Sequence, residues 1–327
     1  MRRAGLALAL VFLAGCSAPA QPPAAPPAPT STAPASPTAV PLPDSAPDTI
    51  TLPPGFSPEG IAVSPAGDTA YLGNRETGAI IRVDLATGAT TPLVPASGTP
   101  AQGMKLDDRG RLYVAGADSG HARIVDSRSG KQLADFALVA RPTEDNTLIN
   151  DGVLTSDAWW LTDSRNAVLY RIALPADGSV PTARDVQVVK LGGDFAVSDG
   201  INANGIASDG SSLYIVQSNT GKLFRVSVPD GRTTQVQLPV SLEDGDGLLL
   251  DGSTLYVAQN DPNTLTVLRL DPSGVRGSLV TRVKDARFDK PTTIAAVGSR
   301  LYLPNARFDV EPTATTRYTL VSVPRPG

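Results

Sequence analysis

From residue 48 onward the chain alternates short apolar stretches with polar turns rich in Gly, Asp and Asn. Many of the apolar stretches carry β-branched and aromatic residues and are bounded by Asp-Gly or Asn-Gly, a pattern typical of β-strands and hairpins. No stretch of useful length has the 3.6-residue period of an amphipathic helix. The pattern predicts an all-β domain.

One three- to four-strand unit recurs six times in this domain. Each first strand begins at a triplet, and the third residues of successive triplets lie 42 to 53 positions apart: PEG 58–60, AQG 101–103, NDG 150–152, ANG 203–205, GDG 245–247 and PTT 291–293. An aromatic residue follows in each second strand, beginning with Tyr71 and Tyr113. Units of this length predict a six-bladed β-propeller. We expect the aromatic positions to pack between blades, and TITLP, residues 49–53, to join the last blade and close the ring.

The N-terminus has a different composition. Arg2 and Arg3 precede the apolar run LALALVFLAG, which is too short to span a bilayer and predicts an export signal. LAGC at 13–16 resembles the bacterial lipobox, which implies cleavage before Cys16, lipidation of its thiol and retention at the cell envelope. An ordinary signal peptide is the alternative. Residues 17–47 hold eleven prolines and predict a disordered tether. The expected organisation is therefore a signal peptide at 1–15, a lipidated Cys16 and tether at 16–47, and a propeller at 48–327.

Charge and residue usage exclude several classes of function. The net charge is −4 with no basic block, so nothing indicates nucleic-acid binding. We expect a monomer that meets the membrane through its lipid anchor alone. His121 is the only histidine, which rules out multi-histidine zinc sites and argues against a Ser-His-Asp triad.

First strands line the central channel of a propeller, so the six triplets should meet at one mouth. The residue before the last triplet position is Glu59, Gln102, Asp151, Asn204, Asp246 or Thr292, and Asn150 lies one residue earlier in the third unit. Second strands should end at the same mouth, with polar residues at Asn74, Asp118, Asp163, Asn219, Asn260 and Asn305. Carboxylates and amides are the oxygen ligands that Ca²⁺ prefers. The alternative is that each triplet only shapes a turn. SLEDGDGLLLDG at 241–252 does not fit a helix–loop–helix calcium loop, because Leu248 occupies a ligand position.

The ordered triplets PEG, NDG, ANG and GDG resemble those of the senescence marker protein, gluconolactonase and luciferin-regenerating enzyme family. The resemblance implies that Glu59, Asn204 and Asp246 bind Ca²⁺ or another divalent cation, that Asn150 is a further ligand or a substrate contact, and that Asp246 is the catalytic base. Sugar-lactonase members carry Arg two residues before the third-unit Asn, whereas this chain has Leu148.

These observations predict a calcium-dependent hydrolase of lactones or related esters, exported and lipid-anchored. One alternative is a non-catalytic cell-envelope propeller that binds a protein or glycan ligand. A second is a metal-free interaction domain in which the triplets are only turns.

Overall fold

The computed structural model describes residue 1 and residues 42–326, and the account below concerns 42–326. The predicted signal peptide, Cys16 and most of the Pro-rich segment lie outside the described residues. Within the described part, strands are joined by turns and by one short 3-10 segment, η1 (Ala183–Asp185). None of the helical structure described there is long and apolar enough to cross a membrane.

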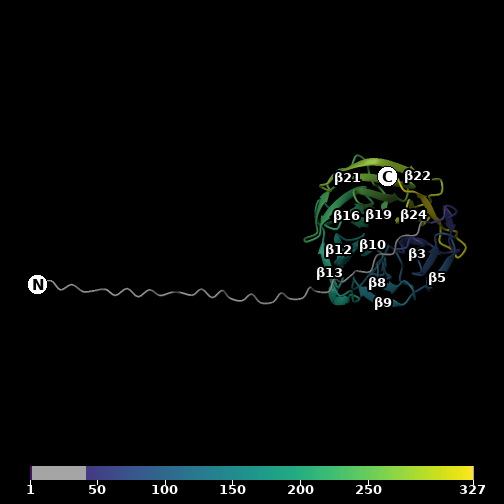
Figure 1. Cartoon of the computed structure of the whole chain (residues 1–327), viewed down its shortest axis with the longest axis horizontal. Coiled ribbons are helices and arrows are strands. Elements are labelled where there is room, and N and C mark those ends of the chain that lie inside the picture. The colour runs from purple at the N-terminus through teal and green to yellow at the C-terminus, as the bar shows by residue number, and fades with distance from the viewer. Residues whose placement is uncertain (2–41, 327) are drawn as a thin grey trace. The chain divides into compact units, whose positions relative to one another are not determined.

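The strands form six antiparallel sheets arranged as the blades of a propeller (Figure 1). Blade 1 contains β2 (Pro58–Val63), β3 (Thr69–Asn74), β4 (Ile80–Asp84) and β5 (Thr90–Val94). Blade 2 contains β6 (Met104–Leu106), β7 (Arg111–Ala115), β8 (His121–Asp126) and β9 (Gln132–Ala137). Blade 3 contains β10 (Ile149–Leu154), β11 (Ala158–Asp163), β12 (Val168–Ala173) and β13 (Val186–Lys190).

Blade 4 contains β15 (Ala203–Ser208), β16 (Ser212–Gln217), β17 (Lys222–Ser227) and β18 (Arg232–Gln235), with the short β14 (Gly192–Gly193) added in parallel at its outer edge. Blade 5 contains β19 (Gly245–Asp251), β20 (Thr254–Gln259), β21 (Thr264–Leu270) and β22 (Gly277–Lys284). Blade 6 contains β23 (Ala295–Val297), β24 (Arg300–Asn305), β25 (Thr319–Pro324) and β1 (Thr49–Thr51). The predicted six-bladed, all-β architecture is confirmed.

The ring closes as the sequence predicts, because β1 pairs with β25 from the other end of the chain. Ile50, which is buried, lies opposite Leu320. Arg287 reinforces this seam by donating from Nη1 to the backbone oxygen of Asp48 at 3.0 Å. Pairing β1 inside the last blade removes the open sheet edges that an unclosed ring would expose.

The apolar core is divided into six clusters, each lying between neighbouring blades. The aromatic residues of the second strands belong to these clusters. Tyr113 of blade 2, for example, meets Trp159 of blade 3 in a T-shaped contact with ring centroids 5.1 Å apart. Side chains of this size bury enough apolar area to hold adjacent blades together without disulfides.

The first strand of each blade lies innermost, and from blade 6 through blade 1 to blade 5 each first strand contacts the next around the central axis. The last strands β5, β9 and β13 lie at the rim of the ring in Figure 1. The inner strands therefore place the predicted triplets around one end of the channel.

Candidate functional site

Four of the inner strands carry the same β-bulge, and the candidate ligands lie in it. In blades 1, 3, 4 and 5 the pairing between the first and second strands is interrupted at one point. There, two consecutive residues of the first strand lie opposite a single residue of the second strand. The first of the two is Glu59, Asn150, Asn204 or Asp246. A bulge turns a side chain out of the normal alternation of a strand, which is why bulges recur beside active sites. Four residues separated by long stretches of sequence thus occupy equivalent places around one channel.

This register corrects the sequence alignment of the third unit. The sequence pattern aligns Gly152 with the last glycine of the other triplets, which makes Asp151 the counterpart of Glu59. The pairing of Ile149 with Asp163 and of Gly152 with Leu161 instead places Asn150 at the first bulge position and Asp151 where the other blades have glycine. The shift was invisible in the sequence because NDG also contains a plausible Asp-Gly anchor.

The side-chain nitrogens of Asn150 and Asn204 are occupied by identical hydrogen bonds. Asn150 Nδ2 donates to Ser164 Oγ, and Asn204 Nδ2 to Ser218 Oγ, each at 3.0 Å and fourteen residues away. Ser164 Oγ in turn donates to the backbone oxygen of Ala203 in the next blade at 2.7 Å. With the nitrogens committed, each amide has its oxygen left to meet another group.

Two oxygens of the candidate set are buried without a hydrogen-bond partner in the described structure: Glu59 Oε2 and Asn204 Oδ1. Asp246 is also buried, and its Oδ2 accepts a bond from Asn260 Nδ2 at 2.9 Å. Buried acceptors without a partner are costly unless a cation or water meets them. Their presence here fits a site that holds a hard cation.

Glycine at the second bulge position lets neighbouring blades approach closely. A Cβ on Gly60 would lie 2.0 Å from the backbone oxygen of Gln102, and one on Gly205 would lie 1.9 Å from that of Asp246. Neither distance leaves room for a side chain. The glycines of the triplets are therefore required by packing at the channel, which explains the motif beyond its turn-forming tendency.

Three carboxylates influence one another in the channel. Burial raises the pKa of Glu59 well above its ordinary value, and the charges of Asp246 and Asp151 raise it further. Burial also raises the pKa of Asp246 to about 7, opposed by the hydrogen bond from Asn260 and assisted by the charge of Asp151. Acidic groups held close together in a low-dielectric space favour either a proton or a cation between them.

The predicted ring of polar residues at the ends of the second strands forms only in part. Asn74 and Asp163 accept backbone N–H bonds within their own turns. Asn305 accepts the N–H of Asp289 from the loop before its blade, and Asn219 Nδ2 bonds to the 198–199 segment. Of the six predicted residues, Asn260 is the one with a hydrogen bond to a candidate ligand in the described structure. The polar ends of the second strands therefore serve mainly to shape loops.

A polar cavity of about 320 Å³ lies over blades 1 to 3, and Gln102, the middle residue of the blade 2 triplet, forms part of its wall. Its charged or polar lining comprises Arg75, Glu76, Gln102, Asp118, Glu144 and Arg165. Leu148 also lines it, at the position where sugar-lactonase members carry arginine. The guanidinium of Arg75 is held by Ser57 Oγ at 3.0 Å and by Glu76 at 2.9 Å. We call this space the polar cavity.

No group of three or more His, Cys, Asp or Glu side chains is arranged to hold a metal ion within residues 42–326. The candidate set has only two carboxylates, and its other two members are amides. His121 lies at the start of a third strand, half-exposed, with Nδ1 2.7 Å from Asp135 Oδ1.

Residues 57–303 match the family model described as SMP-30/Gluconolactonase/LRE-like region. The chain belongs to this family. The match covers blades 1 to 5 and the first part of blade 6, and it includes every candidate ligand. No curated protein matches the chain in sequence.

Several solved structures share this fold. Mala s 1, the major allergen of Malassezia sympodialis, has a TM-score of 0.63 at 15% identity, covering 84% of this chain and 96% of its own. The calcium-binding protein regucalcin of Agrobacterium tumefaciens has a TM-score of 0.56 at 22% identity, covering 84% and 92%. A gluconolactonase of Xanthomonas campestris has a TM-score of 0.55 at 18% identity, covering 83% and 89%. At these identities the likeness concerns the fold.

Proposed function

We propose that this chain is a calcium-dependent hydrolase of lactones or related esters. The observation that carries the proposal is the set of four equivalent bulge residues, Glu59, Asn150, Asn204 and Asp246, with unpartnered buried oxygens on two of them. Membership of a family that includes gluconolactonases, and a fold shared with a calcium-binding regucalcin, support the same activity.

Each of the four residues has a distinct role in the proposed site. Glu59 and Asp246 supply negative charge, and Asn204 supplies a neutral oxygen that its bond to Ser218 holds in place. Asn150 is either a further ligand or the group that orients the substrate. A bound Ca²⁺ contributes Lewis-acid polarisation of the acyl oxygen and stabilises the charge that develops on it.

Asp246 is the proposed base. Its Oδ2 is held by Asn260, so the second oxygen is the one able to take a proton from the attacking water. Burial keeps water away from the rest of the carboxylate and fixes its orientation. The polar cavity supplies the substrate pocket, and its charged lining favours a hydroxylated substrate over a fully apolar one.

The test is turnover of a panel of lactones and aryl esters with added calcium and with chelator. Asp246→Asn and Glu59→Gln should reduce turnover by at least about 100-fold, since each removes a group needed at the reacting centre. Asp244→Asn is the matched control, because it makes the same chemical change two residues away, at a turn position with φ of 55° that Asn tolerates. Equal turnover in all three variants would reject the assignment.

One outcome would favour the non-catalytic alternative. Calcium that raises the melting temperature without hydrolysis of any substrate in the panel would make the cation structural. Absence of any calcium effect would favour the metal-free interaction domain.

We further propose that the protein is exported and anchored through lipid on Cys16. The lipobox resemblance at 13–16 supports this. Metabolic labelling with a radioactive fatty acid should mark the wild-type chain and not Cys16→Ser. Labelling of both chains equally would contradict the anchor.

A further inference from the structure

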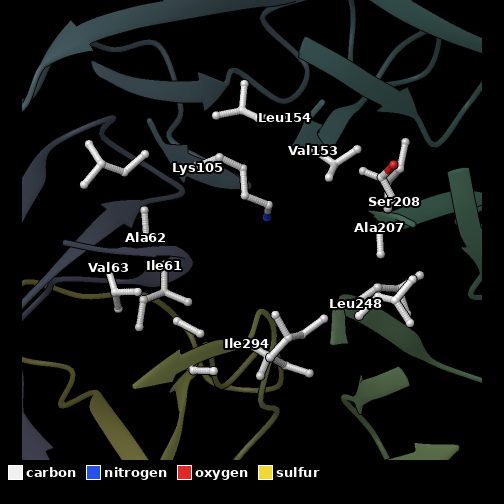
Figure 2. Close-up of a pocket in the computed structure, with 16 residues that line it drawn as sticks. Ile61, Ala62, Val63, Lys105, Val153, Leu154, Ala207, Ser208, Leu248 and Ile294 are labelled. Carbon is white, nitrogen blue, oxygen red and sulfur yellow. The ribbon is translucent and has the colours of Figure 1, made fainter. Parts of the chain in front are cut away.

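A second space occupies the channel beyond the candidate ligands. A few residues farther along the same inner strands, side chains from all six blades line a cavity of about 350 Å³, shown in Figure 2. Its wall is apolar apart from Lys105 and Ser208, and includes Ile61, Leu248 and Ile294. We call this space the apolar chamber. A concave, mostly apolar space of this size with few polar groups has the character of a small-molecule site.

Lys105 is the one charged side chain in the wall of the chamber, and its ammonium points toward the middle of the space (Figure 2). Its Nζ lies 3.2 Å from Asp151 Oδ1. The Lys105 side chain is 28% exposed, whereas that of Asp151 is 3% exposed. The ion pair therefore presents its positive end to the chamber and keeps its negative end in the protein.

Asp151 explains why a lysine is tolerated there. It occupies the second bulge position, where blades 1, 4 and 5 have Gly60, Gly205 and Gly247. Its Oδ1 also accepts the N–H of Gly152 at 2.8 Å, which fixes the carboxylate. An ammonium has three donors, and Asp151 is the acceptor that the described structure gives to Lys105. Donors remain for a group that enters the chamber.

If Lys105 served only as the counter-ion of Asp151, that role would explain its positive charge but not the open apolar space around its ammonium group. A counter-ion needs no open volume around it, whereas the chamber holds about ten times the 30 Å³ that one water molecule occupies in the liquid. Water gains little from an apolar wall. A ligand with one anionic end and one apolar end satisfies both features of the chamber.

We propose that the apolar chamber binds a medium-chain aliphatic carboxylate. The carboxylate accepts hydrogen bonds from Lys105 Nζ, and the chain packs against the apolar wall that includes Ile61, Leu248 and Ile294. This site is separate from the polar cavity and does not depend on the proposed hydrolase activity.

Calorimetric titration of the full chain with octanoate, in the presence of chelator, tests the proposal. We expect one octanoate per chain. Hexanoate should bind about 15-fold more weakly, because two methylenes are lost from the apolar contact. Lys105→Met should weaken octanoate binding at least about 10-fold and leave 1-octanol binding unchanged, since the alcohol lacks the charged end. Lys131→Met, on an exposed turn, is the matched control and should bind like wild type.

A second variant keeps the proposal testable if Lys105→Met fails to fold. Ala207 lines the chamber (Figure 2), and Ala207→Leu would fill part of it while leaving both residues of the Lys105–Asp151 pair unchanged. It should abolish octanoate binding while calcium binding persists. Octanoate that binds Ala207→Leu as tightly as wild type would overturn the proposal, as would no binding to wild type. Loss of binding in Arg165→Met would place the carboxylate in the polar cavity and would overturn it too.

Discussion

Asn150 and Asn204 occupy the same bulge in adjacent blades, and each donates its side-chain nitrogen to a serine fourteen residues farther along the chain. The two bonds are equal in length, at 3.0 Å. Asp246 and Asn260 repeat the spacing in the next blade, with the donor now on the later residue. In blades 3, 4 and 5 the turn after the second strand thus orients the bulge residue of its own blade.

Replacing the serines should weaken calcium binding without removing a ligand. In Ser164→Ala plus Ser218→Ala the amides of Asn150 and Asn204 can rotate and present nitrogen to the cation. Groups that orient ligands in this way contribute about 10- to 100-fold to metal affinity, and calorimetry with calcium should show a loss in that range. Ser129→Ala, in an exposed turn, is the control. Unchanged affinity in the double variant would show that the serines do not orient the site.

The glycine after Asn204 should be intolerant of substitution. A Cβ at Gly205 would lie 1.9 Å from the backbone oxygen of Asp246, so Gly205→Ala must push blades 4 and 5 apart. Overpacking of this kind costs roughly 1–3 kcal/mol or more, which chemical denaturation measures. Gly192→Ala in the same blade is the control, since its Cβ would meet nothing within 4 Å. Equal stability of the two variants would contradict the close approach.

Much of the fold could be predicted from the sequence, because the repeat encodes it locally. Each unit carries its own turns, its apolar strands and an aromatic residue for the space between blades, and the leftover strand at 49–53 has only the last blade to join. The same repeat also indicates Glu59, Asn204 and Asp246 as candidate ligands, because it places their carboxylate or amide groups at one equivalent position in three units.

The rest of the site depends on contacts that no local pattern specifies. The alignment at Asp151 was ambiguous by one residue, and only strand pairing resolved it. Ser164 and Ser218 do carry a sequence signal, the constant spacing of fourteen, but it has meaning only once the bulge positions are aligned. No sequence pattern singles out Lys105, because its role depends on the ion pair with Asp151 of the neighbouring blade.

The metal-free protein should show a pH dependence that originates at Asp246. Folding raises the pKa of this carboxyl from 3.8 to about 7, so folding favours its protonated form. Its contribution to stability is full below pH 3.8 and is lost as the pH rises toward 7. Asn at this position stays neutral throughout. In chelator, Asp246→Asn should therefore gain in melting temperature relative to wild type between pH 4 and pH 7.

Calcium should reverse that difference at pH 7.5, because the wild-type carboxylate then has a cation to meet and the variant amide has less charge to offer. Melting curves of wild type and Asp246→Asn, each with calcium and with chelator, give the four melting temperatures that this comparison needs. A constant difference between the two proteins across the pH range in chelator would show that Asp246 does not titrate in the folded state.

Leu148 should limit the binding of sugar lactones. It lines the polar cavity, where an arginine would add charged donors for substrate hydroxyls. Hydrogen bonds to charged groups contribute roughly 1.5–3 kcal/mol, so Leu148→Arg should lower KM for δ-gluconolactone about 10-fold or more and leave KM for phenyl acetate, which has no hydroxyl groups, nearly unchanged. Leu133→Arg, at an exposed position on β9, is the matched control. Equal shifts of KM for the two substrates would mean that Leu148 acts on the shape of the cavity and not on recognition of hydroxyl groups.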